Sequence, residues 1–329
     1  MKAFNPVIGN DGIATSSTKE TIEQILKYHF PLKLYSENTL PISLNRKDYF
    51  PISNEEIESA LAKIKPNKAP GIDNIPGEII KEIYFANKVW FGYFLNYLLR
   101  NGNFPTPWKL ARVVLIPKAG KSLVEASHYR PICLLPTWGK LFDRIITDRL
   151  IYYLDVNNVI SPNQFGFRKG RSTITALQKI KNFIKNADSE GNITCLISID
   201  IKNAFNSIDW QILKQKINRL PLPSYLIHIL FDFLSNRFIS ADDFDISYNM
   251  GIPQGSCLGP ALWNIFINDL LEIDFGTKVK IQAFADDLII MMREKATYLF
   301  KRTSIGPLEV NPSTLYLFSC EVPQDISFF

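Results

Sequence analysis

The stretch KVKIQAFADDLIIMM, residues 278–292, sets two aspartates side by side between apolar residues. The apolar runs on either side of Asp286 and Asp287 predict two strands joined at a tight corner, Ala285-Asp286-Asp287. A corner pressed against an apolar core holds two like charges where water is scarce, which is costly unless a cation offsets them. The stretch therefore predicts a β-hairpin with a cation site at its tip.

A third carboxylate ends a second apolar stretch. NITCLISIDI, residues 192–201, predicts a buried strand that delivers Asp200 at its end, beside the pair formed by Asp286 and Asp287. Oxygen donors with no His or Cys nearby favour Mg²⁺ or Mn²⁺ over zinc. Two such ions can lower the pKa of an attacking hydroxyl and stabilise the leaving oxygen of a phosphoryl transfer. The alternative is a turn with solvated charges, and the apolar flanks argue against it.

Charge is unevenly spread along the 329 residues. The whole chain is 46% apolar and carries 37 Lys and Arg against 32 Asp and Glu, a net charge of +5. Residues 107–181 hold 13 of the basic and 4 of the acidic residues, a net of +9. A cationic region beside a carboxylate site is typical of proteins that grip phosphates, although a solvated basic face would give the same count.

Cysteine spacing and the N-terminus set limits on the class of protein. The four cysteines lie far apart and have no C-x-x-C spacing, which favours neither a zinc site nor a disulfide framework. No basic segment followed by an apolar stretch opens the chain, and no apolar run approaches the roughly 18 residues that span a bilayer. We expect a soluble protein of a reducing, intracellular compartment.

Periodicity and capping signals predict further elements. Residues 18–30 have helical spacing with Thr18 or Thr21 as the cap, and residues 53–65 repeat that form with Ser53 as N-cap and Glu56 three residues on. The other expected elements are a helix that ends at Gly102, a strand over residues 111–118, and helices over residues 171–187 and 257–271.

Seven motifs, in order and spacing, resemble the reverse transcriptase domain of non-LTR (LINE-type) retrotransposons. The resemblance runs from about Lys68 to Met292. The motifs are NKAPGIDNIPGEII, WKLARVVLIPKAGK, YRPICLLPTWGKLFDRIITDRL, NQFGFRKGRSTITAL, ISIDIKNAFNSIDW, NMGIPQGSCLGPALWNIFINDLL and AFADDLII.

The resemblance implies an α+β protein with the right-hand polymerase fold, comprising fingers and palm. In it, Asp200, Asp286 and Asp287 are the catalytic and metal-binding triad, which holds two Mg²⁺ or Mn²⁺ ions. The implied divisions are an N-terminal extension (1–50), fingers with an N-terminal helical region (51–191), a palm segment with the first catalytic Asp (192–208), a helical insertion of fingers and palm (209–250), a palm segment with the PQG helix and the ADD hairpin (251–295) and a divergent tail (296–329).

Five residues match the family's nucleotide-binding positions. Lys118 and Arg130 match basic residues of the fingers that engage the triphosphate. Phe205 matches the aromatic residue that closes the sugar pocket and excludes a 2′-hydroxyl, and a core Phe beside a strand is its alternative. Gln254 lies against the incoming nucleotide in the family, and Gly255 permits close backbone approach there.

Three basic residues around the glycines of FGFRKGR, namely Arg168, Lys169 and Arg171, are expected to contact the template backbone. The partners that the resemblance implies are an RNA template, a DNA primer and deoxynucleoside triphosphates, with no membrane. The family also implies a larger polyprotein with an upstream endonuclease, and location in the nucleus and cytoplasm.

The chain departs from the family's pattern in two places. After Met292 the expected signals fail, so we expect the helical thumb to be absent and the grip on primer and template to be weak. Asn206 stands where the family often has Asp. A catalytically silent nucleic-acid-binding remnant is therefore the main alternative to a polymerase. A two-metal nuclease and an RNA-dependent RNA polymerase are disfavoured by Phe205 and, for the nuclease, by the PQG segment.

Overall fold

The computed structural model describes residues 6–9, 12–33, 48–201, 203–241, 244–295 and 315–322. The chain divides into two compact units. The first unit contains residues 1–157 and 205–262, and the second contains residues 158–204 and 263–329. Each unit mixes helices with a four-stranded sheet, which agrees with the expected α+β class.

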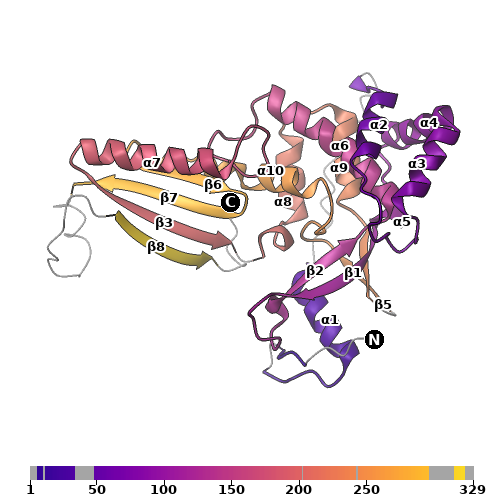
Figure 1. Cartoon of the computed structure of the whole chain (residues 1–329), viewed down its shortest axis with the longest axis horizontal. Helices are drawn as coiled ribbons and strands as arrows, with labels where there is room; N and C mark the ends of the chain where they lie inside the picture. Colours follow the sequence, from indigo (N-terminus) through magenta and orange to yellow (C-terminus); the bar gives the residue numbers. More distant parts are fainter. Residues whose placement is uncertain are drawn as a thin grey trace. The chain divides into compact units, whose positions relative to one another are not determined.

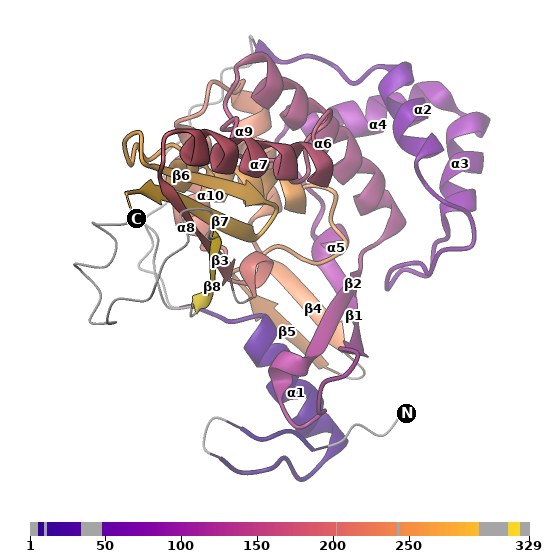
Figure 2. The same cartoon turned by 60° about the vertical axis from the view of Figure 1, so that its left-hand side comes forward.

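The sheet of the first unit has the strand order β2-β1-β4-β5 (Figure 2). Strand β1 pairs antiparallel with β2 and parallel with β4, and β4 pairs antiparallel with β5. The strands are β1 (Leu110–Pro117), β2 (Tyr129–Leu134), β4 (Arg237–Ala241) and β5 (Phe244–Tyr248).

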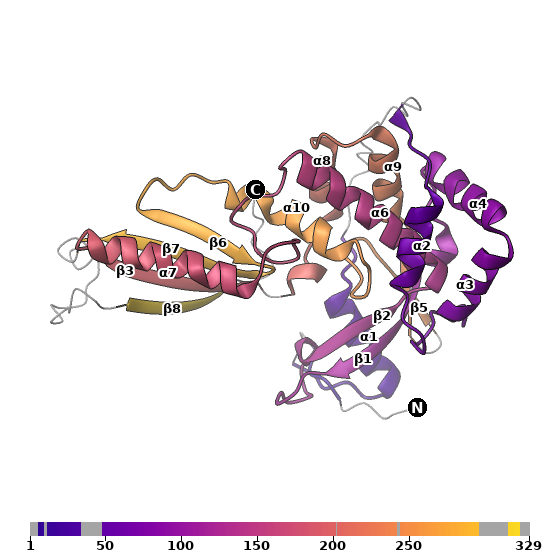
Figure 3. The same ribbon diagram turned by 45° about the horizontal axis from the view of Figure 1, so that its top comes forward.

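Several helices of the first unit contribute to an aromatic cluster. Trp108 and Trp138 stack with ring centroids 6.1 Å apart, and Phe91 stacks on Trp138 at 5.0 Å. Figure 3 shows three helices of this unit, α2, α3 and α4, gathered beside α6. The helices are α1 (Thr18–His29), α2 (Asn54–Ala62), α3 (Gly77–Ala86), α4 (Lys88–Arg100), α5 (Thr106–Lys109), α6 (Thr137–Val156), α8 (Trp210–Asn218) and α9 (Ser224–Phe233), with short 3₁₀ turns η2 (Ala126–His128) and η3 (Ala204–Asn206).

The sheet of the second unit has the strand order β6-β7-β3-β8. Helix α7 runs along this sheet (Figure 1), and a small core forms where Ile180 of the helix meets Leu196 and Met291 of the strands. The elements are α7 (Thr173–Ser189), β3 (Ile193–Ile201), β6 (Val279–Phe284), β7 (Asp287–Glu294) and β8 (Leu315–Val322), while α10 (Gly259–Leu271) runs from the first unit into the second.

Most of the expected elements are present, with two differences. Ser53 caps α2 in a full capping box with Glu56, as predicted, but α1 is capped by Ser17 and not by Thr18 or Thr21. The hydroxyl of Thr21 is turned inward and bonds to Thr15 and to the Ser17 carbonyl oxygen. Strand β8, which the sequence did not predict, pairs parallel with β3. The expected absence of a thumb concerns the residues after Met292, of which 296–314 and 323–329 lie outside the described residues.

Candidate active site

The tip of the β6–β7 hairpin is a two-residue turn. Phe284 pairs with Asp287, which leaves Ala285 and Asp286 as the turn residues. Ala285 has φ +60°, while Asp286 is not among the positive-φ residues. Positive φ at the first turn position alone is the pattern of a type II′ turn, where glycine is the usual residue. Alanine is held in this conformation by its surroundings.

Two segments of the second unit that are distant in sequence, around Gln164 and at Trp263, surround the Ala285 peptide. The Gln164 side chain accepts a bond from the Ala285 amide (3.1 Å) and donates one to its carbonyl oxygen (3.3 Å). The Trp263 indole donates to the same carbonyl oxygen at 2.9 Å. Gly166 lies so close that a Cβ there would come within 2.0 Å of the Ala285 amide nitrogen. These contacts fix where Asp286 stands.

The three expected catalytic aspartates meet at this hairpin. Asp200 of β3 is the antiparallel partner of Asp287 in β7, and both side chains are exposed, whereas Asp286 is half-buried. Burial raises the pKa of Asp286, its own backbone amide lowers it, and the negative charges of Asp287 and Asp200 raise it further. The carboxylates are therefore close enough to disfavour one another's charge.

A divalent cation suits this donor set in its chemistry. The three carboxylates offer hard oxygens, and a bound cation would oppose the burial and the neighbouring negative charges that raise the pKa of Asp286. Over the described ranges, no group of three or more His, Cys, Asp or Glu side chains is arranged to hold a metal ion. The metal triad thus remains a prediction, for which the structure supplies the neighbouring aspartates.

The three expected template-binding residues lie on the loop before α7, in the second unit. Arg168 is half-buried and donates to the carbonyl oxygens of Ile160 (3.1 Å) and Ser161 (2.7 Å), so part of its guanidinium holds its own loop. Arg171 is exposed and lies 5.0 Å from the ring centroid of Phe165. Lys169 is exposed. Contact with a template stays a prediction for all three.

The five expected nucleotide-binding residues all belong to the first unit. Lys118 follows β1 and is half-buried, and Arg130 of β2 is exposed. Phe205 is half-buried and its carbonyl oxygen accepts the Ile252 amide at 2.9 Å. This bond joins the segment of Phe205 to the loop residue Ile252, which directly precedes the PQG segment.

The PQG segment is fixed by its backbone. The Gln254 carbonyl oxygen accepts the Cys133 amide at 2.9 Å. Gly255 has φ +129°, and a Cβ there would come within 2.6 Å of the Cys133 carbonyl oxygen. Both the conformation and the close approach to Cys133 require glycine. The expected approach of this backbone to a nucleotide stays a prediction.

Asp143, which the sequence did not single out, anchors the same segment. This carboxylate of α6 is 1% exposed and accepts bonds from the Ser256 hydroxyl (2.8 Å), from the amides of Cys257 (2.7 Å) and Leu258 (3.0 Å), and from the Thr147 hydroxyl of its own helix (3.4 Å). Burial raises the pKa of Asp143, and the bonds from residues 256–258 oppose that rise. The residues that follow Gln254 are thus tied to α6.

Asn206 is also structural in this chain. Its side-chain amide is buried and lies 3.0 Å from Nδ1 of His29, whose Nε2 lies 3.1 Å from the Ala126 carbonyl oxygen. An amide that donates to Nδ1 suits a neutral imidazole, and burial lowers the pKa of His29 to about 4. Asn at this position, where the family often has Asp, can therefore donate to the neutral His29 of α1.

The comparisons with known proteins agree with the motifs. Residues 116–304 match the family described as reverse transcriptase (RNA-dependent DNA polymerase). The chain is 31% identical to the RNA-directed DNA polymerase from mobile element jockey of Drosophila melanogaster over 294 residues, which is 86% of this chain and 30% of the relative.

Two further relatives give the same picture. The chain is 31% identical to the probable RNA-directed DNA polymerase from transposon BS of Drosophila melanogaster, over 78% of this chain and 29% of the relative. It is 27% identical to the retrovirus-related Pol polyprotein from type-1 retrotransposable element R1 of Bradysia coprophila, over 86% and 28%. The chain thus spans less than a third of the length of these relatives. It belongs to the reverse transcriptase family, in the branch found in non-LTR retrotransposons.

Proposed function

We propose that this chain performs RNA-directed DNA synthesis, by nucleotidyl transfer to the 3′-hydroxyl of a DNA primer. The observation that supports this most is the Asp286 turn, which Gln164 and Trp263 fix beside Asp200 and Asp287. Catalytic groups need a rigid support, and a carboxylate with a raised pKa at such a place is a candidate for chemistry.

The aspartates would act by holding two Mg²⁺ or Mn²⁺ ions. When bound, such ions lower the pKa of the attacking hydroxyl and stabilise the leaving pyrophosphate oxygen. The protein's own contribution is to keep Asp200, Asp286 and Asp287 in one place with their charges unpaired by any Lys or Arg within the described part of the chain. Hydrogen bonds to the Ala285 peptide prevent the turn from moving away when repelled.

Nucleotide selection is proposed for the first unit. Lys118 and Arg130 would bind the triphosphate, for which Arg offers two parallel donors and Lys a mobile charge. Gln254 would lie against the nucleotide, and Phe205 would exclude a ribose 2′-hydroxyl. The bond from Ile252 to the Phe205 carbonyl oxygen and the Asp143 anchor would keep both side chains in register.

The fingers and palm divisions stated above, the missing thumb and the upstream endonuclease also remain proposals. A nucleic-acid substrate and a longer parent polyprotein suit the retrotransposon relatives. Within the described residues, no helix is both long and apolar enough to cross a bilayer.

Primer extension tests the proposed function. Oligo(dT) annealed to poly(rA) should be extended with dTTP and Mg²⁺ or Mn²⁺, and Asp286→Asn should abolish extension while leaving primer-template binding intact. A wild-type chain that binds primer-template but never extends it in either metal would favour the binding remnant. The lack of a closed metal-binding group in the described part of the chain is the observation that favours this second candidate.

A further inference from the structure

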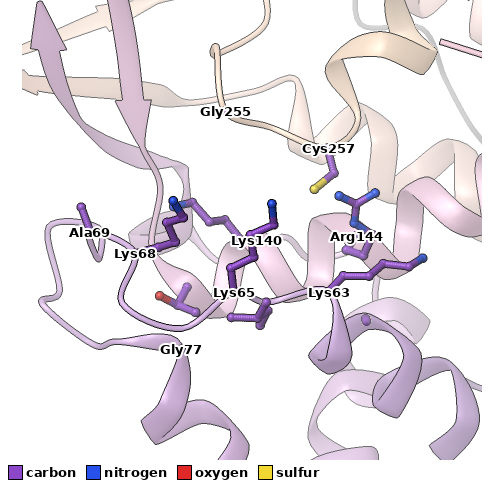
Figure 4. A pocket seen from close by; sticks show the side chains of 12 residues that line it. Lys63, Lys65, Lys68, Ala69, Gly77, Lys140, Arg144, Gly255 and Cys257 are labelled. Carbon is purple, nitrogen blue, oxygen red and sulfur yellow. The ribbon is translucent and has the colours of Figure 1, made fainter.

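A basic pocket lies in the first unit, and of the site residues discussed above its lining includes only Gly255 and Cys257. It has a volume of about 230 Å³ and opens to solvent. Figure 4 shows the side chains of Lys140 and Arg144 reaching toward the loop of Gly255 and Cys257, while Lys63 extends away from them. The lining residues are Ala60, Lys63, Ile64, Lys65, Lys68, Ala69, Gly77, Thr137, Lys140, Arg144, Gly255 and Cys257.

The pocket has an excess of positive charge. Five of its twelve lining residues are Lys or Arg, and none is acidic. Lys63 is paired with Asp148 at 2.7 Å, but the other four cations have no ion-pair partner among the residues that the structure describes. Burial lowers the pKa of Lys140, and the nearby Cys257 and Asp73 oppose this decrease. An anionic ligand would relieve this unfavourable burial of charge.

Two helices also begin at the pocket. Gly77 is the first residue of α3 and Thr137 is the first residue of α6, and each helix follows a proline with no side-chain cap. The Thr137 hydroxyl donates to the Ile75 carbonyl oxygen, so it does not serve as a cap. Uncapped amides and the positive end of the helix dipole favour an anion, and here they add to four unpaired cations.

The loop that carries Lys65 and Lys68 is held in place. The Asn67 amide donates to the Glu78 carboxylate at 2.9 Å. Further along, a Cβ on Gly71 would come within 2.4 Å of the Pro136 nitrogen, so only glycine allows the loop to pack against the start of α6. A cationic loop that is already ordered loses little entropy on binding.

We propose that this pocket binds a backbone phosphate of single-stranded nucleic acid. The inference rests on the proposed function, which supplies a template strand, and it adds lysines and an arginine to which no role is assigned above. The lining contains no aromatic side chain on which a base could stack. A pocket with cations, helix amides and no base platform holds a phosphate without reading the base. Its border at Gly255 places it next to the segment proposed to meet the nucleotide.

Salt-dependent binding of RNA tests the proposal without any need for catalysis. The wild type, Lys65→Gln/Lys68→Gln and a control, Lys27→Gln/Lys88→Gln, would be titrated with a fluorescent 20-nucleotide single-stranded RNA between 50 and 200 mM salt, without divalent metal. The control removes the same charge from lysines of the same unit that are already paired with Glu23 and Glu58. Thermal unfolding of the three proteins would check that each is folded.

In the pocket variant, the plot of log K against log salt should be less steep by about 1.4, since each lysine–phosphate contact to a single strand contributes about 0.7 to the steepness. If both proteins bind equally at 1 M salt, the pocket variant should bind about 25-fold more weakly than the wild type at 0.1 M salt. The control should keep the wild-type slope. Equal slopes in all three proteins, or no binding of RNA by the wild type, would overturn the proposal.

A free triphosphate is the other source of the same chemistry. If the pocket served a nucleotide, dTTP at millimolar concentration would compete with the RNA. The double variant would then have a raised KM for dTTP and an unchanged affinity for the RNA strand. That result would also overturn the proposal. A wild type that binds RNA through the pocket but fails to extend a primer would contradict the proposed function alone.

Discussion

Gly166→Ala is expected to inactivate the chain by displacing the Asp286 turn. A Cβ at this position would stand 2.0 Å from the amide nitrogen of Ala285, 2.6 Å from its Cα and 2.9 Å from its Cβ. Ordinary van der Waals contact begins at 3.4 Å, so the nearest approach is too short by about 1.4 Å. Two of these three atoms are backbone, which no rotamer change can move aside.

The displacement sets the size of the effect. A misplacement of about 1 Å at a reacting centre costs on the order of 100-fold in rate, and catalytic groups tolerate only about 0.5 Å. Moving Ala285 also strains its bonds to Gln164 and Trp263. We expect kcat/KM to fall at least about 100-fold and the free energy of unfolding to fall by about 1–3 kcal/mol, as for other overpacked cores.

Primer extension and thermal unfolding would measure these two effects, and Gly92→Ala is the matched control. A Cβ on Gly92, within α4, would meet nothing closer than 3.9 Å. Replacing glycine by alanine inside a helix should stabilise the chain by about 0.5–1 kcal/mol and leave extension unchanged. Gly166→Ala with activity within a few-fold of the wild type would refute the proposed role of the turn.

Three other perturbations have defined outcomes. The pKa of His29 is about 4 in the folded chain against 6.5 unfolded, so the unfolded chain binds more protons between these values. The free energy of unfolding should therefore fall by about 3 kcal/mol as pH drops from 6.5 to 4, and this step should vanish in His29→Gln, as denaturant titrations would show. Asp143→Asn leaves one acceptor oxygen for four donors and should raise the KM for dTTP more than it lowers kcat, and an unchanged KM would count against the anchor. Phe205→Val should raise the use of rNTP relative to dNTP in single-nucleotide addition. A constant ratio with a lower melting temperature would instead make Phe205 a core residue.

Local features of the fold were predictable from the sequence. The hairpin around Asp286, the strand that ends at Asp200 and the capping box of Ser53 each depend on residues within one short segment. Periodicity and capping act over such distances, so one segment contains the whole signal. The motifs also sufficed to identify the family, because seven segments in order constrain the fold together.

Strand β8 and the Ser17 cap were missed for different reasons. A parallel strand beside β3 depends on pairing between residues about 120 positions apart, for example Thr194 with Leu315, and no local pattern encodes that pairing. At α1, three hydroxyl residues precede the helix, and the inward turn of Thr21 toward Thr15 decided which position became the cap.

The sequence by itself determined the family, the secondary structure around the aspartates and the kind of chemistry that their carboxylates suit. Only the tertiary structure showed that Gln164 and Trp263 fix Ala285, and that Asp143 is tied to residues more than 110 positions away. It also gathered the lysines of residues 63–68 and the start of α6 into one basic pocket. The physical reason is that such contacts join residues far apart in the chain, and their energies depend on distances and burial that arise only when the chain is folded.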